Sequence, residues 1–82
     1  MAKITFSTME KFIIDKIEEI TFSQVERTDS LWEEKILDSI TIVELVVELE
    51  NEFHVKVPFN EIVIENFETV QKIAAYLNSK IG

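Results

Sequence analysis

The segment Ile36-Leu37-Asp38-Ser39-Ile40 and the helical pattern that follows it, residues 41–53, decide the fold predicted for this chain. Apolar residues recur at intervals of three and four along that pattern, at Ile42, Leu45, Val46, Leu49 and Phe53. This spacing predicts a helix over residues 39–53 with one face in a core. Ser39 therefore stands at a predicted helix entrance, with Asp38 directly before it.

The segments before this helix show a second helical pattern and a long connection. Residues 7–20 predict a first helix, in which Ser7 and Glu10 fit a capping box. Residues 21–37 exceed the ordinary length of a loop. We expect the apolar side chains of this connection to hold it on the core: Phe22, Val25, Leu31, Trp32, Ile36 and Leu37.

The segments after the central helix complete the predicted fold. Pro58 stops helical continuation, so residues 59–67 hold at most a short helix. The residues of that segment expected to face inward are Ile62, Val63 and Phe67. Thr69 is predicted to cap a last helix, whose inner face comprises Val70, Ile73, Ala74 and Leu77. We therefore predict an all-α fold, a small four-helix bundle with three principal helices and one short helix, in which residues 1–82 form a single domain.

Charge and composition limit the classes of partner. The chain has sixteen acidic and eight basic residues, which gives a net charge of −8. Such a charge argues against nucleic acid and anionic membranes and favours a partner with a basic patch. No stretch approaches the roughly 18 apolar residues of a membrane span, and the first residues lack the apolar run of a signal peptide. We therefore expect a cytoplasmic protein.

Two apolar side chains on the central helix fall outside its predicted core face. Val43 and Val47 follow Ser39 by four and eight residues, so they share its side of the helix. Glu44 and Glu48 edge that side. The surface suits docking of a partner, but a nearly buried central helix explains the two valines as well, and we expect burial for Val43.

Neither hydrolysis nor metal binding is supported by the pattern of polar residues. The single histidine, His54, follows Ser39 by a helical distance of about 22 Å, at roughly 1.5 Å per residue. A general base must lie within hydrogen-bond reach of its nucleophile. We therefore expect no catalytic residue and no metal site, while weak binding of a divalent cation by the acidic helix face stays open.

The residue Ser39 itself has two interpretations. A helix entrance offers unpaired N–H groups and a partial positive charge, which favour an anion such as a phosphodiester on the Ser39 oxygen. Serine is also a common helix N-cap, and the local sequence alone favours that simpler role. A hydroxyl with no base beside it suits a group that another enzyme modifies.

A wider sequence pattern favours the interpretation in which Ser39 is modified by another enzyme. Four segments together resemble the phosphopantetheine-binding acyl carrier protein family: Leu37-Asp38-Ser39-Ile40, Val43-Glu44-Leu45, Leu49-Glu50 and Val57-Pro58. The resemblance implies a four-helix bundle in which Ser39 carries 4′-phosphopantetheine. It implies that a phosphopantetheinyl transferase attaches this group from coenzyme A, with Asp38 supporting the modification. The thiol of the arm then holds an acyl or aminoacyl group as a thioester.

The resemblance also implies a partner-binding face on the central helix, formed by Ile40, Val43, Glu44, Val47, Glu48 and Glu50. Its expected partners are the phosphopantetheinyl transferase, an acyl- or aminoacyl-loading ligase or transferase, and condensing or other biosynthetic enzymes with basic docking patches. The carrier is expected to be a monomer and a substrate of enzymes, not an enzyme itself.

The cargo implied by the resemblance is an acyl intermediate of fatty-acid, polyketide or related biosynthesis. An aminoacyl or D-alanyl carrier is the alternative, and a non-catalytic acidic helical adaptor is a second one. Thr41 stands where fatty-acid carriers often have an acid, and Phe67 is the only aromatic of the segment where D-alanyl carriers usually have a tryptophan. These departures favour a specialised acyl or aminoacyl pathway.

Overall fold

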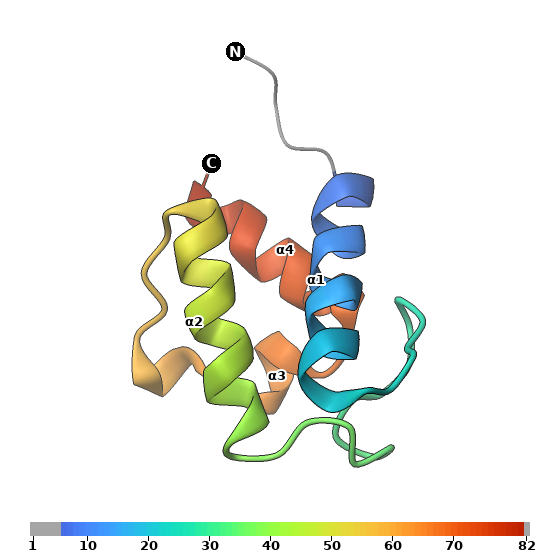
Figure 1. The fold of residues 1–82 in the computed structure, drawn as a ribbon. Helices are drawn as coiled ribbons and strands as arrows, with labels where there is room; N and C mark the ends of the chain where they lie inside the picture. The colour runs from blue at the N-terminus through green and yellow to red at the C-terminus, as the bar shows by residue number, and fades with distance from the viewer. Residues whose placement is uncertain (1–5, 82) are drawn as a thin grey trace.

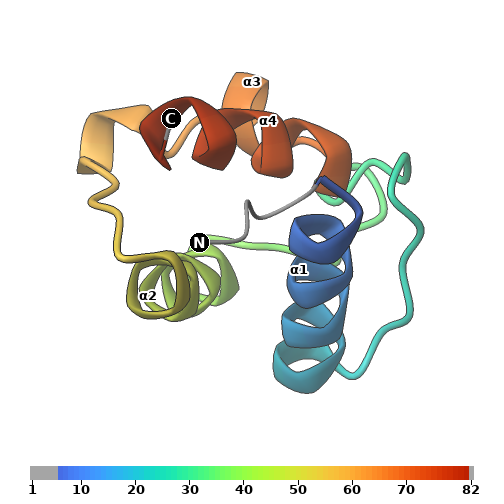
Figure 2. The ribbon, with the colours of Figure 1, turned by 90° about the horizontal axis from the view of Figure 1, so that it is seen from above.

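The computed structural model describes the backbone of residues 6–81 and the side chains of residues 8–81. In chain order, the described elements are α1 (Phe6–Thr21), α2 (Thr41–Phe53), the 3-10 helix η1 (Phe59–Glu61), α3 (Ile64–Phe67) and α4 (Val70–Ile81). Figure 1 shows α1 and α2 running in opposite directions, and Figure 2 shows α4 lying across one side of the pair. Helix α1 packs on both α2 and α4, while α3 packs on α4. The predicted all-α bundle is confirmed.

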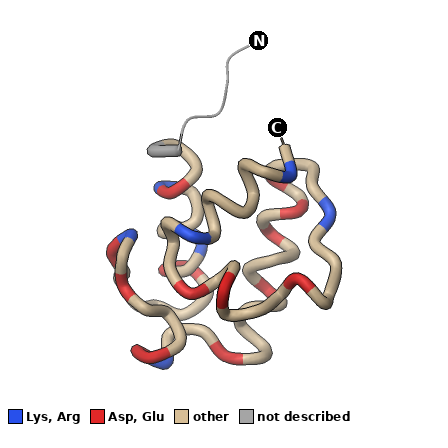
Figure 3. The backbone as a smooth tube through the Cα atoms, turned by 180° about the vertical axis from the view of Figure 1, so that it is seen from behind, with Lys and Arg blue, Asp and Glu red and all other residues tan. Residues whose placement is uncertain are grey.

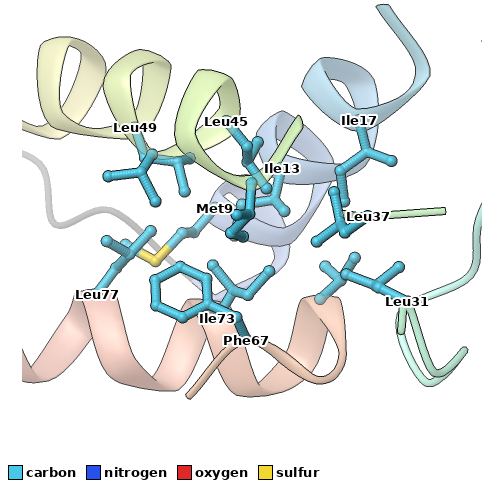
Figure 4. Packing of buried hydrophobic residues seen from close by; sticks show 14 of the residues in the cluster. Met9, Ile13, Ile17, Leu31, Leu37, Leu45, Leu49, Phe67, Ile73 and Leu77 are labelled. Atoms are coloured by element: carbon cyan, nitrogen blue, oxygen red, sulfur yellow. The ribbon is translucent and has the colours of Figure 1, made fainter. Parts of the chain in front are cut away.

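The core forms where the apolar faces of the three long helices meet. Figure 4 shows side chains from these helices converging with those of the connections. The most deeply buried residues of the three helices include Met9, Ile13, Ile17, Leu45, Leu49, Ile73 and Leu77. Each such side chain stabilises the fold by about 1.5–3 kcal/mol relative to an exposed position. None of the described helices is long and apolar enough to span a membrane.

Within the described residues, helix α1 extends from Phe6 and so includes one residue before the predicted start. The side chain of Ser7, predicted to cap this helix, lies outside the described residues. Glu10 is buried, and its two carboxylate oxygens accept hydrogen bonds from Arg27 at 2.9 and 3.0 Å. The capping box of Ser7 and Glu10 stays a prediction, and the Glu10 carboxylate holds the connection after α1 against the helix.

The long connection between α1 and α2 is fastened to the segment that precedes α4. Leu31 is fully buried, and its backbone N–H donates to the Glu68 carbonyl at 2.8 Å. The indole Nε1–H of Trp32 donates to the Phe67 carbonyl at 2.9 Å. The prediction that Leu31 and Trp32 hold this connection on the core is confirmed.

Two apolar residues outside the long helices are exposed, although they were predicted to face the core. Phe22 is 91% exposed, because the chain takes a left-handed conformation there, with φ at 59°. Val63 is extended, and neighbours in an extended segment point to opposite sides. Ile62 takes the inner side, so Val63 points outward. Both predictions of burial are wrong.

The segment after α2 is fixed in place by two carboxylates. Glu50 accepts a hydrogen bond from the backbone N–H of Val57 at 2.8 Å. Glu61 accepts a hydrogen bond from the Tyr76 hydroxyl, and it lies 2.8 Å from the Lys80 ammonium. Lys80 and then Tyr76 lower the pKa of Glu61, while burial and then Glu61 raise the pKa of Tyr76. These contacts tie the segment before η1 to α2 and η1 itself to α4.

Candidate functional site

Helix α2 begins at Thr41, two residues later than predicted. The side chain of Asp38, three residues earlier, binds the backbone at the helix entrance. The Oδ1 atom of Asp38 accepts hydrogen bonds from the backbone N–H groups of Ile40 at 2.9 Å and Thr41 at 2.8 Å. The Thr41 N–H lowers the pKa of Asp38 most, followed by the Ile40 N–H and the Thr41 hydroxyl. Asp38 is therefore an ionised cap, and the N-cap role considered for Ser39 is wrong.

Ser39 occupies the turn between this cap and the helix. Its side chain is exposed, and its hydroxyl makes no hydrogen bond to the residues that the structure describes. The bonds that close the turn come from its neighbours, because Asp38 and Thr41 pair with each other around it. The Ser39 oxygen is thus held at the helix entrance without being used by the fold.

A small apolar hollow of about 210 Å³ adjoins Ser39. Its other lining residues are Trp32, Ile42, Val43, Phe59 and Ile62. Trp32 is held there by its bond to the Phe67 carbonyl, whereas Phe59 is 84% exposed at the rim. Sequence reasoning missed this hollow, because it treated Trp32 only as a loop anchor. The available signal was Pro58, which ends the helical pattern and allows the chain to fold back along α2.

The outer face of α2 carries exposed apolar residues next to Ser39. Ile40 is 69% exposed, Val43 45% and Val47 48%. The predicted burial of Val43 is wrong, because the core is filled from the adjacent stripe of the helix that contains Ile42 and Val46. The three exposed side chains follow one another at intervals of three and four, which places them on one side of the helix.

Acidic residues accompany these apolar ones. Figure 3 shows acidic positions along the length of α2, whose sequence holds Glu44, Glu48, Glu50 and Glu52 and no basic residue. Glu44 and Glu48 are exposed, and Glu48 lies 3.7 Å from the Lys16 ammonium of α1. Glu50 differs from them, since it is half-buried and its carboxylate holds the backbone of Val57.

The polar residues considered for catalysis or metal binding do not gather around Ser39. His54 follows the last residue of α2 in a left-handed conformation, so it lies at the opposite end of that helix. The Asp38 carboxylate is occupied by the helix cap. Among the described residues, no group of three histidine, aspartate or glutamate side chains is arranged to hold a metal ion.

Ser39 is thus an exposed serine, unbonded within the described chain, at a helix entrance beside an apolar hollow and an acidic helix face. The family model described as "Phosphopantetheine attachment site" matches residues 14–77. The chain therefore belongs to the phosphopantetheine-binding carrier family, whose members hold 4′-phosphopantetheine covalently.

Two relatives and one solved structure are similar to this chain over most of its length. The D-alanyl carrier protein of Streptococcus uberis is 41% identical over 68 residues, which cover 80% of this chain and 86% of that protein. The D-alanyl carrier protein of Lactococcus lactis subsp. cremoris is 40% identical over 75 residues, which cover 88% of this chain and 95% of that protein. A chain in a solved structure described as "Crystal structure of FAD-dependent dehydrogenase" is 33% identical, with a TM-score of 0.69 over 84% of this chain and 97% of that one.

The residues at the entrance of α2 fit the prosthetic group of the family. The group needs an accessible hydroxyl for its phosphodiester, and Ser39 is exposed and unbonded within the described structure. The hollow next to Ser39 offers an apolar surface to the stem of the arm. When bound, the arm supplies the thiol on which a carboxylic acid is held as a thioester.

Proposed function

We propose that this chain is a D-alanyl carrier protein, a single-domain monomer that carries D-alanine on 4′-phosphopantetheine attached to Ser39. The observation that supports the cargo is the similarity to two D-alanyl carrier proteins at 41% and 40% identity, over most of each chain. The relatives favour this alternative over the fatty-acid or polyketide role that the sequence analysis placed first. They also support a carrier over an acidic adaptor without a prosthetic group.

The proposed attachment uses the free hydroxyl of Ser39. In the step catalysed by a phosphopantetheinyl transferase, the Ser39 oxygen attacks the β-phosphorus of coenzyme A. The bond from that phosphorus to the bridging oxygen breaks, adenosine 3′,5′-bisphosphate leaves, and a base on the transferase takes the hydroxyl proton. Asp38 supports this step by closing the first turn of α2, which holds the Ser39 backbone at the helix entrance.

The geometry beside Ser39 favours a small cargo. Residues in the middle of the bundle, including Leu45, Leu49 and Ile73, are fully buried against one another. The hollow at Ser39 lies outside this core, and its volume of about 210 Å³ is below the ~300 Å³ at which ligand pockets usually begin. A D-alanyl group, whose α-carbon carries only a methyl and an amine, needs no buried chamber.

Partner enzymes are proposed to bind the face of α2 that begins at Ile40. Val43 and Val47 provide its apolar centre, while Glu44 and Glu48 provide negative charge for arginine and lysine on the partner. Glu50 was placed on this face from sequence, and its bond to Val57 supports a second role in positioning the segment that carries Phe59. The proposed partners are the transferase and a ligase that loads D-alanine with ATP, and the proposed compartment is the cytoplasm.

A second candidate is a carrier of another amino acid that presents its cargo to a flavin-dependent dehydrogenase. It rests on the similarity to a chain from the dehydrogenase structure. Because 84% of this short chain covers 97% of that one, the matched chain is itself of carrier size. The D-alanyl carrier proteins are more similar in sequence to this chain, at 41% and 40% identity against 33% for the chain from the dehydrogenase structure.

Loading of the modified chain separates these candidates. The phosphopantetheinylated protein is incubated with ATP and the D-alanine-activating ligase of its host, and its intact mass is measured. We expect the addition of one D-alanyl group, removed by hydroxylamine because it is a thioester, and no addition to Ser39→Ala. Failure to accept D-alanine, with efficient acceptance of another amino acid or an acyl group from its own ligase, contradicts the D-alanyl assignment.

A further inference from the structure

Phe22 is an aromatic residue in a position that folding does not explain. It follows the last residue of α1 with φ at 59°, and its backbone N–H donates to the Glu18 carbonyl at 2.8 Å. Thr21 closes the same turn, because its hydroxyl donates to the Ile17 carbonyl and accepts from the Ser23 N–H. These bonds close the end of the helix and hold Phe22 in the left-handed region where glycine and asparagine are preferred.

A phenylalanine is unfavourable at position 22 because of both its backbone conformation and its exposed side chain. Left-handed conformations are unfavourable for residues with a bulky side chain. The ring is 91% exposed, so burial does not offset that cost. The other two described residues with positive φ, Lys35 and His54, are polar and exposed. Only at Phe22, among these three, does a large apolar group stand in water.

The position of Phe22 relates it to the entrance of α2. The rings of Phe12 and Phe53 lie 5.3 Å apart, and Lys16 lies 3.7 Å from Glu48. These two contacts show that the helices are antiparallel, so later residues of α1 lie beside earlier residues of α2. Continued by six residues, this register brings Phe22 level with the first turn of α2, and Figure 1 shows the end of α1 and the start of α2 at the same end of the molecule.

Acidic residues border Phe22 and the face of α2 alike. Glu18 and Glu19 are exposed in the last turn of α1, as Glu44 and Glu48 are on α2. Lys16 pairs with Glu19 and Glu48, whereas Glu18 and Glu44 make no ion pair with the described residues. An apolar ring with negative charge around it is complementary to an apolar pocket edged by arginine and lysine. Aromatic anchors in such pockets carry much of the binding energy of protein interfaces.

We propose that Phe22 is an anchor for the ligase that loads the carrier, seated in an apolar pocket with a basic rim on that enzyme. This inference rests on the proposed function and extends the partner-binding face from α2 to the end of α1. The ligase is the expected occupant because it acts at the free end of the arm, so its contacts are displaced from Ser39. The transferase must instead enclose the Ser39 oxygen itself.

The test replaces Phe22 by glycine, which removes the ring and relieves the backbone. For phosphopantetheinylated Phe22→Gly, we expect the KM for the carrier in ATP-dependent D-alanylation to rise about tenfold or more, as for loss of an interface anchor. We expect kcat to change little, and Tm to stay the same or rise because glycine tolerates this conformation. Phe22→Trp should keep a KM near that of the wild type.

His54→Gly is the matched control, because it relieves the same backbone conformation at the far end of α2. Its KM should be unchanged, as should the rate at which the transferase modifies Phe22→Gly. An unchanged KM for Phe22→Gly, or an equal rise in KM for His54→Gly, contradicts the proposed role of Phe22 but leaves the D-alanyl carrier function standing. A wild type that the ligase does not load overturns the proposed function and this inference together.

Discussion

Asp38 and Thr41 bind each other in both directions at the entrance of α2. The Asp38 Oδ1 atom accepts a hydrogen bond from the Thr41 N–H at 2.8 Å, and the Asp38 N–H donates to the Thr41 hydroxyl at 2.8 Å. The pair closes the first turn of the helix and leaves Ser39, which lies between its members, exposed. Asp38 therefore caps the helix, and the adjacent Ser39 is left free for the proposed attachment.

The Asp38 cap predicts a specific dependence of stability on pH. The pKa of Asp38 is lowered in the folded state, so its ionised form stabilises the fold above the unfolded pKa of about 3.9, and this contribution is lost as the pH falls through the folded value. Thermal melts should show Asp38→Ala less stable than the wild type at pH 7. The Tm difference between the wild type and Asp38→Asn, which keeps a neutral cap, should shrink below about pH 4. A difference that stays constant down to pH 2 would argue against an ionised cap.

Helix α2 offers two apolar positions with opposite expected responses to truncation. Leu45 is fully buried, so Leu45→Ala should lower the free energy of unfolding by about 2–5 kcal/mol. Val47 is 48% exposed, so Val47→Ala should change it by no more than about 0.5 kcal/mol. Urea denaturation of the two variants provides the comparison. Equal losses would show that Val47 belongs to the core.

The single tryptophan reports on the hollow beside Ser39. Trp32 lines this hollow together with Ser39, and its ring is fixed by the bond to the Phe67 carbonyl. Attachment of phosphopantetheine should therefore change the wavelength or intensity of Trp32 emission. Ser39→Ala, treated with the same transferase and coenzyme A, serves as the control. Identical spectra before and after complete modification would place the arm away from the hollow.

The contact between Glu10 and Arg27 predicts that Arg27→Ala lowers Tm and that adding Glu10→Gln restores part of the lost Tm. Arg27→Ala should lower Tm, because it leaves the buried Glu10 carboxylate without its partner. Adding Glu10→Gln should recover part of the loss, since a neutral amide is less costly to bury than a carboxylate. A double-mutant cycle by thermal denaturation measures this coupling. Strictly additive losses would mean that the pair contributes nothing jointly.

Helix periodicity predicts the inner faces of α2 and α4 correctly, because burial follows a 3.6-residue repeat that local sequence displays. The repeat places Val43 outside the core face, but it does not show whether a central helix is buried on its other side as well. The expected burial of Val43 is therefore wrong, since it is 45% exposed. The start of α2 was placed too early, because Asp38 and Ser39 are both capping residue types. Only the folded turn shows that Asp38 makes the bonds.

Other features of the site depend on tertiary structure. The hollow joins Trp32 of the first connection with Phe59 and Ile62 of the second, and no local pattern links segments so far apart. Phe22 was expected in the core because a run of sequence gives no sign of a left-handed backbone unless glycine or asparagine marks it. Both features lie where the chain changes direction.

The measurement that tests the central claim most directly is the mass of the unmodified chain before and after incubation with coenzyme A, magnesium and a broad-specificity phosphopantetheinyl transferase. We predict a gain of one phosphopantetheinyl group, located by peptide mapping at Ser39. Ser39→Ala should gain nothing, whereas the control Ser30→Ala should gain as much as the wild type. A wild type that stays unmodified, or a Ser39→Ala chain that is still modified, would contradict Ser39 as the attachment site.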